Sequence, residues 1–164
     1  MLNVTRPCLI LDKFQDFDAQ KFAQKGYKAL LIDLDNTLVP YFEKKINNDV
    51  IRFFETNSKF GIQTIIFSNN NSKRVKSFAA DSNIPYYYRC LKPFKFNYKR
   101  VINKHGYKNS EVICMGDQLI TDVIGANRMH LFSIYVKPII ESDSIQTRLN
   151  RKIEHWLFKR MDLK

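Results

Sequence analysis

The apolar run Ala29–Ile32 is followed at once by two carboxylates spaced two residues apart, Asp33 and Asp35. A strand buried on both faces of a sheet reads as an unbroken apolar run, and in an open α/β sheet the functional residues gather where such strands end. Residues i and i+2 of an extended chain point to the same side, so both carboxylates can face one crevice. There they repel each other unless a proton or a cation lies between them, which predicts a metal site.

Several other apolar runs alternate with amphipathic segments. We expect strands at about residues 29–32, 64–67, 86–90, 112–115 and 131–136. This alternation predicts an α/β fold in three layers, Rossmann-like, with a mostly parallel five-stranded sheet between helices. Capping residues support it: Asp18 begins a helix that ends at Gly26, Asn47 or Asn48 begins one that ends before Gly61, and Ser142 or Asp143 begins the last.

The length of 164 residues, 45% of them hydrophobic, predicts one domain over 1–164. Within it we expect a lead-in segment and helix at 1–27, a core that carries the motifs at 28–136, and a basic amphipathic helix at 142–161. The gaps at 38–67 and 69–91 each hold little more than one crossover. The sequence therefore predicts no sizeable cap domain and an open site.

Three further polar motifs each follow an apolar stretch. They are Phe67-Ser68-Asn69-Asn70, Cys90-Leu91-Lys92-Pro93 and Met115-Gly116-Asp117-Gln118-Leu119-Ile120-Thr121-Asp122. With the first motif they supply carboxylates, a hydroxyl and an ammonium, which are the groups that phosphoryl transfer needs.

The order of these motifs resembles the haloacid dehalogenase-like (HAD) superfamily of phosphatases: DxDxT, a Ser or Thr after a strand, a Lys, and GDxxxxD. The segments GDQLITD and LKPF resemble the cap-less bacterial YqeG-like group, which is related to mitochondrial phosphatidylglycerophosphate phosphatases. The resemblance covers residue 28 to about 136. It implies an HAD-like fold, magnesium-dependent hydrolysis of a phosphate monoester, and phosphatidylglycerophosphate as the substrate.

The chemistry assigns catalytic roles to three residues. Asp33 is the expected nucleophile, which attacks phosphorus and becomes an aspartyl-phosphate. Asp35 is the expected acid for the departing alkoxide and then the base for the hydrolytic water. Lys92 is expected to offset the charge of the phosphate.

The remaining motif residues are expected to bind the phosphate or the metal. We expect Thr37, Ser68, Asn69 and Lys92 to bind the substrate phosphate. Mg²⁺ prefers oxygen ligands, and we expect them from Asp33, from Asp35 through its backbone carbonyl, and from Asp117. Asp122 is expected to lie one shell further out, where it orients Lys92 or a metal-bound water.

Each motif also has an ordinary structural interpretation. Asp, Asn and Thr form turns and helix caps, so Asp35, Thr37 and Asp117 fit turns. Ser68 fits a polar turn in which Ser72 caps a helix that begins at Lys73. Asp122 fits the start of a helix, where the helix dipole favours an acid. Only the ordered set of motifs separates these interpretations from a catalytic site.

The net charge of +11 is uneven, because residues after 40 carry 22 basic and 11 acidic side chains. Such a field attracts polyanions: nucleic acid, an anionic lipid surface or a phosphorylated substrate. The alternative explanation of this charge is a compositional bias of the chain. The helix at 142–161 has an apolar stripe that fits packing on the sheet, and a basic face that fits an anionic bilayer.

Three separate cysteines predict neither a disulfide framework nor a zinc site. The sequence has neither a run as long as a membrane span nor a signal peptide, so we expect a cytoplasmic protein, peripheral at a membrane if it acts on a phospholipid. No obligate protein partner is inferred. The alternatives are a polynucleotide-end or small-metabolite phosphatase and a non-catalytic module that is phosphorylated or binds a ligand on the same fold.

Overall fold

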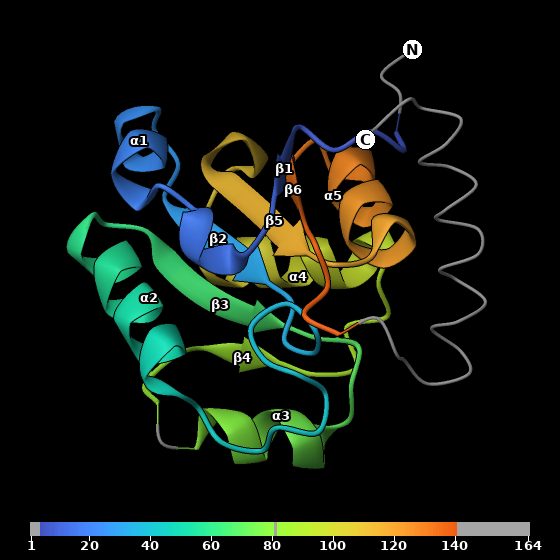
Figure 1. Cartoon of the computed structure of the whole chain (residues 1–164). Coiled ribbons are helices and arrows are strands. Elements are labelled where there is room, and N and C mark those ends of the chain that lie inside the picture. Colours follow the sequence, from blue (N-terminus) through green and yellow to red (C-terminus); the bar gives the residue numbers. More distant parts are fainter. Residues whose placement is uncertain (1–3, 81, 141–164) are drawn as a thin grey trace.

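Six parallel strands form one sheet in this computed structural model, which describes residues 4–80 and 82–140 (Figure 1). Their spatial order is β1 (Leu9–Leu11), β6 (Phe132–Val136), β5 (Val112–Gly116), β2 (Ala29–Ile32), β3 (Gln63–Phe67) and β4 (Tyr86–Tyr87). Strand β2 therefore lies between β5 and β3, with its carboxyl end beside theirs. This arrangement confirms the α/β class and the parallel sheet.

The predicted number of five strands is wrong, because the lead-in segment contributes a sixth. β1 pairs with β6 at the sheet edge, with Leu9 opposite Ile134. Its three residues are only partly buried, so their apolar run is too short to be distinguished from a packed loop. The strand expected at 86–90 stops at Tyr87, and the left-handed φ angles of Arg89 (49°) and Leu91 (51°) are incompatible with extended backbone there.

Five α-helices connect the described strands: α1 (Ala19–Gln24), α2 (Asn48–Lys59), α3 (Ser72–Ala79), α4 (Lys95–Lys104) and α5 (Ile124–Arg128). Short helical turns are η1 (Phe14–Asp16), η2 (Asn109–Glu111) and the π-helical η3 (Leu119–Val123). The caps predicted at Asp18 and Asn47 are confirmed, since their side chains accept from Lys21 N and Val50 N. Asn71 rather than Ser72 caps α3.

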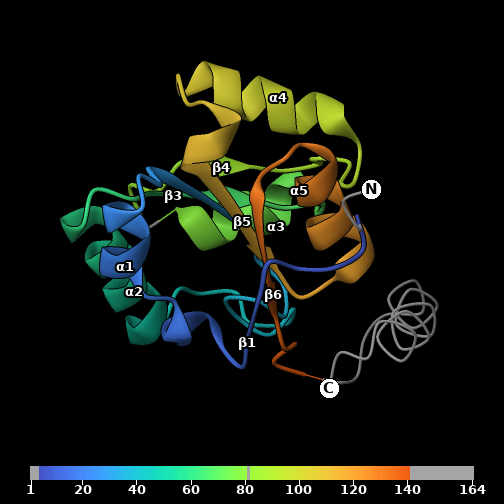
Figure 2. The same ribbon diagram turned by 90° about the horizontal axis from the view of Figure 1, so that it is seen from above.

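Helices cover both faces of the sheet, as the three-layer prediction requires. α1, α2 and α3 pack on one face and α4 and α5 on the other (Figure 2). A hydrophobic core lies on each face of the sheet, and the side chains of β2 alternate between them. Leu30 and Ile32 pack in the core with α1, α2 and α3, whereas Ala29 and Leu31 pack in the core with α4 and α5. Burial on both faces explains why this strand reads as a continuous apolar run.

The connections between these elements are short. Residues 33–47 join β2 to α2, and residues 68–85 hold only α3 before β4, so no cap domain occurs within the described ranges. None of the helices in 4–80 and 82–140 combines the length and apolar character that a bilayer crossing needs. The helix expected at 142–161 lies outside the described residues, and the domain boundaries stay a prediction.

Candidate active site

Asp33 is the first residue after β2, at the edge where the parallel strands end. Its backbone N–H donates to the carbonyl of Met115 at 2.9 Å, which continues the ladder toward β5 and fixes the position of the residue. The chain then turns sharply: Asn36 has a φ of 63° and donates its N–H to Val39 O at 2.8 Å. This turn buries Thr37 and leaves Asp35 half-buried beside the site.

Lys92 lies at the centre of the site between two carboxylates. Its Nζ donates to Asp33 Oδ1 at 2.6 Å and to Asp122 Oδ1 at 2.7 Å, and all three side chains are buried. Burial by itself disfavours the charged amine, but Asp122 and Asp33 outweigh burial and raise the pKa of Lys92. Lys92 therefore carries a fixed positive charge beside the expected nucleophile.

The pKa of the Asp33 carboxyl group lies near neutral pH. Burial raises its pKa to about 7, with Lys92 acting against the shift and Asp122 adding to it. A further cation close to Asp33 would favour its ionised form, which is the form that can attack phosphorus.

Asp117 completes a cluster of three buried carboxylates. One oxygen each of Asp33, Asp117 and Asp122 lies within 4.8 Å of the others, close enough for a single metal ion. The hydroxyl of Thr37 donates to Asp117 Oδ1 at 3.3 Å. Three carboxylates surround the single positive charge of Lys92, and buried carboxylates that ionise need compensating charge. The donor set, all oxygen, fits Mg²⁺.

Asp122 reaches this cluster because of the tight turn that follows β5. Its Oδ2 accepts the backbone N–H of Gln118 at 3.1 Å, and its Oδ1 accepts from Lys92. A Cβ at Gly116 would overlap the carboxylate of Asp122, so only glycine leaves the space that this side chain occupies. The sequence placed Asp122 next to Lys92 or a metal-bound water, and the structure brings it into direct contact with Lys92.

The carboxylate of Asp35 points to a different set of partners. Asn70 Nδ2 donates to its Oδ2 at 2.9 Å, and Arg74 Nε donates to its Oδ1 at 2.9 Å. Its side-chain oxygens are outside the cluster of three carboxylates. Any metal contact by Asp35 therefore rests on its backbone carbonyl, and this contact stays a prediction.

Ser68 and Asn69 follow β3 and shape the loop that faces the site. Ser68 is buried, and its Oγ accepts the backbone N–H of Asn70 at 3.0 Å. Asn69 holds the backbone of Lys92 from both sides: Oδ1 accepts the N–H of Lys92 at 2.7 Å, and Nδ2 donates to its carbonyl at 3.1 Å. Asn69 thus positions Lys92, and its predicted contact with the phosphate stays a prediction.

Comparison with known proteins places this chain in a family. A model of the mitochondrial PGP phosphatase family matches residues 3–141, most of the chain. The probable phosphatase YqeG of Bacillus subtilis is 37% identical over 135 residues, which are 82% of this chain and 78% of that protein. The chain belongs to the mitochondrial PGP phosphatase family. It is thus a phosphatase, and the family inferred from the four motifs is confirmed.

One further relative and two solved structures are more distant from this phosphatase. Phosphatidylglycerophosphate phosphatase 1, chloroplastic/mitochondrial, of Arabidopsis thaliana is 25% identical over 153 residues, 87% of this chain but only 44% of that protein. The chain therefore spans less than half of that relative. A crystal structure of an uncharacterized protein from Listeria monocytogenes serotype 4b matches with a TM-score of 0.57 at 17% identity, over 72% of this chain and 84% of that one. The crystal structure of a hypothetical protein from Xanthomonas campestris matches with a TM-score of 0.52 at 16% identity, over 75% of this chain and 71% of that one. These two likenesses concern the fold alone.

Two residues beside Asp35 were not predicted from the sequence to have a role at the site. Asn70 and Arg74 hold Asp35, and neither was assigned a role from the sequence. Asn70 lies within the motif after β3, so its position beside Ser68 was a usable signal. Arg74 lies in the first turn of α3. A basic residue at such a position is usually an exposed, solvated side chain, so the sequence alone does not indicate a role for it.

Proposed function

We propose that this phosphatase hydrolyses phosphate monoesters through an aspartyl-phosphate on Asp33, with Mg²⁺, and that its substrate is phosphatidylglycerophosphate. The observation that carries the proposal is the buried ammonium of Lys92, 2.6 Å from Asp33 and 2.7 Å from Asp122, with Asp117 close enough to share a cation. The family and the name of the plant relative support phosphatidylglycerophosphate as the substrate.

In the proposed first step, the carboxylate of Asp33 attacks phosphorus and the bond to the leaving oxygen breaks. Asp35 gives its proton to that oxygen, and an aspartyl-phosphate and a free alcohol result. Lys92 and the hydroxyl of Ser68 offset charge on the phosphoryl oxygens. In the second step Asp35 takes a proton from water, which attacks phosphorus and releases phosphate and Asp33.

The metal would be held by Asp33, Asp117 and the backbone carbonyl of Asp35, with Asp122 and Lys92 adjacent. When bound, Mg²⁺ would neutralise the charge of the phosphoryl group and the carboxylates, and so would let two anions approach each other. The three buried carboxylates against one ammonium support this assignment.

The test is release of phosphate from phosphatidylglycerophosphate, sugar phosphates, nucleotides and 5′- or 3′-phosphorylated oligonucleotides, with and without Mg²⁺. Asp33→Asn should lower kcat by more than about a thousandfold, because it removes the nucleophile. Asp12→Asn is the matched control, since Asp12 also directly follows a strand but is exposed and pairs with Lys137.

Turnover by Asp33→Asn at the wild-type rate would refute the mechanism. A nucleotide, sugar phosphate or oligonucleotide with a higher kcat/KM than phosphatidylglycerophosphate would refute the lipid substrate and favour a metabolite or polynucleotide-end phosphatase. If the folded protein binds Mg²⁺ and turns over none of the panel, the non-catalytic module replaces the proposal.

A further inference from the structure

Large apolar side chains are exposed at the same edge of the sheet as the site. Of the nine exposed large hydrophobic residues in the described part of the chain, seven follow the carboxyl ends of strands, and one of these is Tyr88, directly after β4. We call the other six the apolar rim: Tyr41, Phe42, Leu91, Phe94, Phe96 and Ile139. Exposed apolar residues scattered singly are common, but a group beside a functional site indicates an interaction surface.

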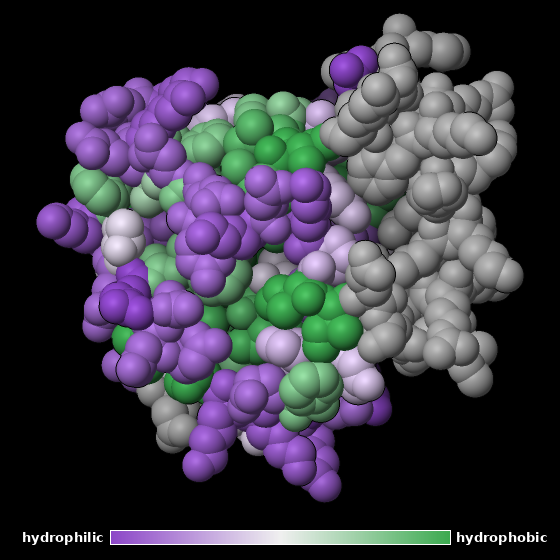
Figure 3. All heavy atoms as spheres, in the orientation of Figure 1, coloured by the Kyte–Doolittle hydropathy of each residue, from purple (hydrophilic) through white to green (hydrophobic). Residues whose placement is uncertain are grey.

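Three separate connections supply the rim and converge at the site. Tyr41 and Phe42 lie between β2 and α2, with ring centroids 5.4 Å apart. Ile139 follows β6, and its N–H donates to the carbonyl of Asn36, three residues beyond Asp33, at 3.0 Å. Figure 3 shows apolar surface near the centre of the view, over the loops that follow β2 and β6, with hydrophilic surface above and below it.

The third connection brings the rim to Lys92. Leu91 precedes Lys92 directly and is 62% exposed while Lys92 is buried, so the backbone turns one side chain into the site and the other out. Phe94 and Phe96 follow at 65% and 73% exposure. Their rings are among the most exposed apolar groups of the described residues, and exposure to water is unfavourable unless a partner covers them.

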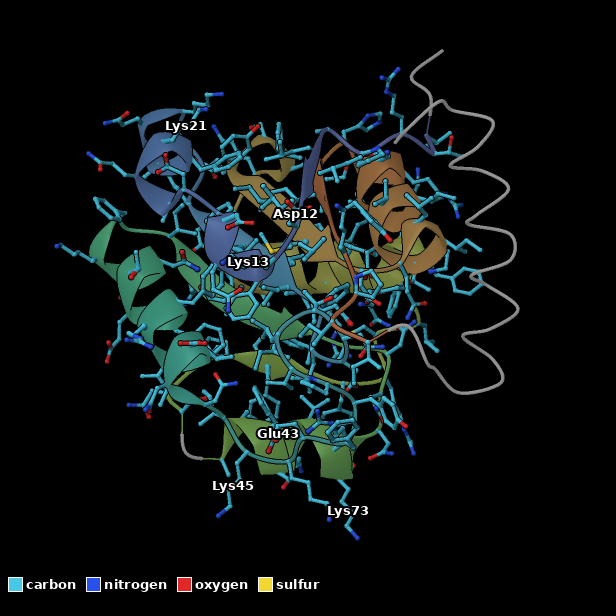
Figure 4. The ribbon with its side chains drawn as sticks, in the orientation of Figure 1. Asp12, Lys13, Lys21, Glu43, Lys45 and Lys73 are labelled. Atoms are coloured by element: carbon cyan, nitrogen blue, oxygen red, sulfur yellow. The ribbon has the colours of Figure 1, made fainter. Side chains whose placement is uncertain are left out.

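The charges around the rim are mostly positive. Exposed basic residues in the same connections and the adjacent helix turns are Lys44, Lys45, Lys73, Arg89, Lys95 and Lys137. The exposed acids nearby are Glu43, Asp49 and Asp12; Asp49 pairs with Arg52 at 2.7 Å and Asp12 with Lys137 at 2.5 Å. Figure 4 shows Lys45 and Lys73 extending away from the ribbon, from the segment before α2 and from α3. A partner of this surface must accept apolar side chains and carry negative charge.

We infer that the apolar rim docks on an anionic lipid bilayer, with the aromatic and aliphatic side chains in the interface and the lysines at the headgroups. Bilayers of anionic lipid combine the two properties that the rim demands. A second copy of the same face would bring the lysines against one another, which disfavours self-association. The inference deepens the proposed function, on which it rests, because the site would then open toward headgroups.

The test is sedimentation of the full chain, as Asp33→Asn, with vesicles of phosphatidylcholine alone or mixed with phosphatidylglycerol. The Asp33→Asn background keeps catalysis out of the measurement. We expect binding to the mixed vesicles, weakened by salt. Phe94→Gln/Phe96→Gln should lower it by about tenfold or more, because the rim loses apolar area that enters the interface. Val4→Gln/Ile51→Gln is the matched control, since both residues are exposed but lie outside the rim.

Several results would overturn the inference. These are no binding to the mixed vesicles, equal loss in the rim and control variants, and a rim-dependent dimer in size-exclusion chromatography. Leu91→Gln provides a second rim variant if the double variant unfolds. The same rim variants with Asp33 intact should hydrolyse soluble 4-nitrophenyl phosphate as the wild type does. Failure of the wild type in that assay would count against the proposed function, while the vesicle assay would still decide the docking.

Discussion

Arg74 holds the carboxylate of Asp35 through a single oxygen: its Nε donates to Oδ1 at 2.9 Å, and its Nη2 lies 2.8 Å from the same atom. Asn70 occupies the other oxygen. The guanidinium of Arg74 also lies over the ring of Phe78, and Cζ of Arg74 is 5.5 Å from the ring centroid. This contact restricts the orientation of the guanidinium. Arg74 is thus a positioning residue for the proposed acid and base.

Arg74→Ala should lower kcat/KM for an alkyl phosphate by about 10- to 100-fold, because Asp35 loses the contact that positions it to protonate the leaving oxygen in the first step. The effect should be smaller for 4-nitrophenyl phosphate, whose leaving group departs without a proton. Steady-state kinetics with both substrates measure the difference. Arg52→Ala is the control, since Arg52 makes a similar contact with Asp49 on exposed α2. Equal losses on both substrates would contradict the assignment.

Gly116→Ala should abolish most activity, because a Cβ at this position overlaps the carboxylate of Asp122 and forces it away from Lys92. We expect a loss of about 1–3 kcal/mol in the free energy of unfolding as well. Gly61→Ala is the comparison: its φ of 76° is unfavourable for alanine, but a Cβ there meets no atom within 4 Å. Denaturant unfolding and phosphate release should show that Gly61→Ala loses stability only. Full activity of Gly116→Ala would refute the argument.

The stability of the metal-free protein should depend on the titration of Asp33. Burial raises the pKa of Asp33 from 3.8 to about 7, so the folded protein binds this proton more tightly than the unfolded chain does. The resulting stability is complete below pH 3.8 and is lost as the pH rises through about 7. The melting temperature of wild type relative to Asp33→Asn should therefore fall between about pH 5 and pH 7 and change little from there to about pH 8.

Saturating Mg²⁺ should reduce this fall, because a bound cation stabilises the ionised form. Asp12→Asn is the control for the titration. The hydrogen bond with Lys137 lowers the pKa of Asp12, so this group is ionised in both states throughout the range. A wild-type difference that stays flat or rises with pH would show that Asp33 is ionised in the folded protein at all these pH values.

The three cysteines should differ sharply in reactivity. Burial raises the pKa of Cys90 and of Cys114 to about 12, whereas Cys8 is exposed. A thiol with so high a pKa holds almost no thiolate at pH 8, and the thiolate is the form that iodoacetamide alkylates. Mass spectrometry should detect one added group on the native protein and three after denaturation. Rapid labelling of Cys90 would show that the loop before Lys92 opens.

Much of this architecture was predictable from local sequence. Strands β2 and β5 are continuous apolar runs, and β3 and β6 each end in an apolar run, because all four are buried between two helical layers and such burial leaves a pattern in the sequence. The caps Asp18 and Asn47 act within four residues of their own position, so they too are visible locally. Strand β1 was not predictable from local sequence, because a three-residue strand at the edge of the sheet depends on pairing with its partner β6.

The residues of the site could likewise be named from their place after each strand, since parallel strands end at one edge and bring Asp33, Lys92 and Asp117 together. The sequence by itself thus determined the fold class, the family and most of the chemical groups present. It did not determine which group contacts which.

Only the tertiary structure decided that Lys92 joins Asp33 to Asp122 and that Arg74 holds Asp35. These pairs are separated by 59, 30 and 39 residues. Their contacts depend on the left-handed turn at Asn36, on the space left by Gly116 and on where α3 packs against the sheet. Side-chain direction in a loop follows from such long-range packing, and a local pattern of residue types carries no record of it.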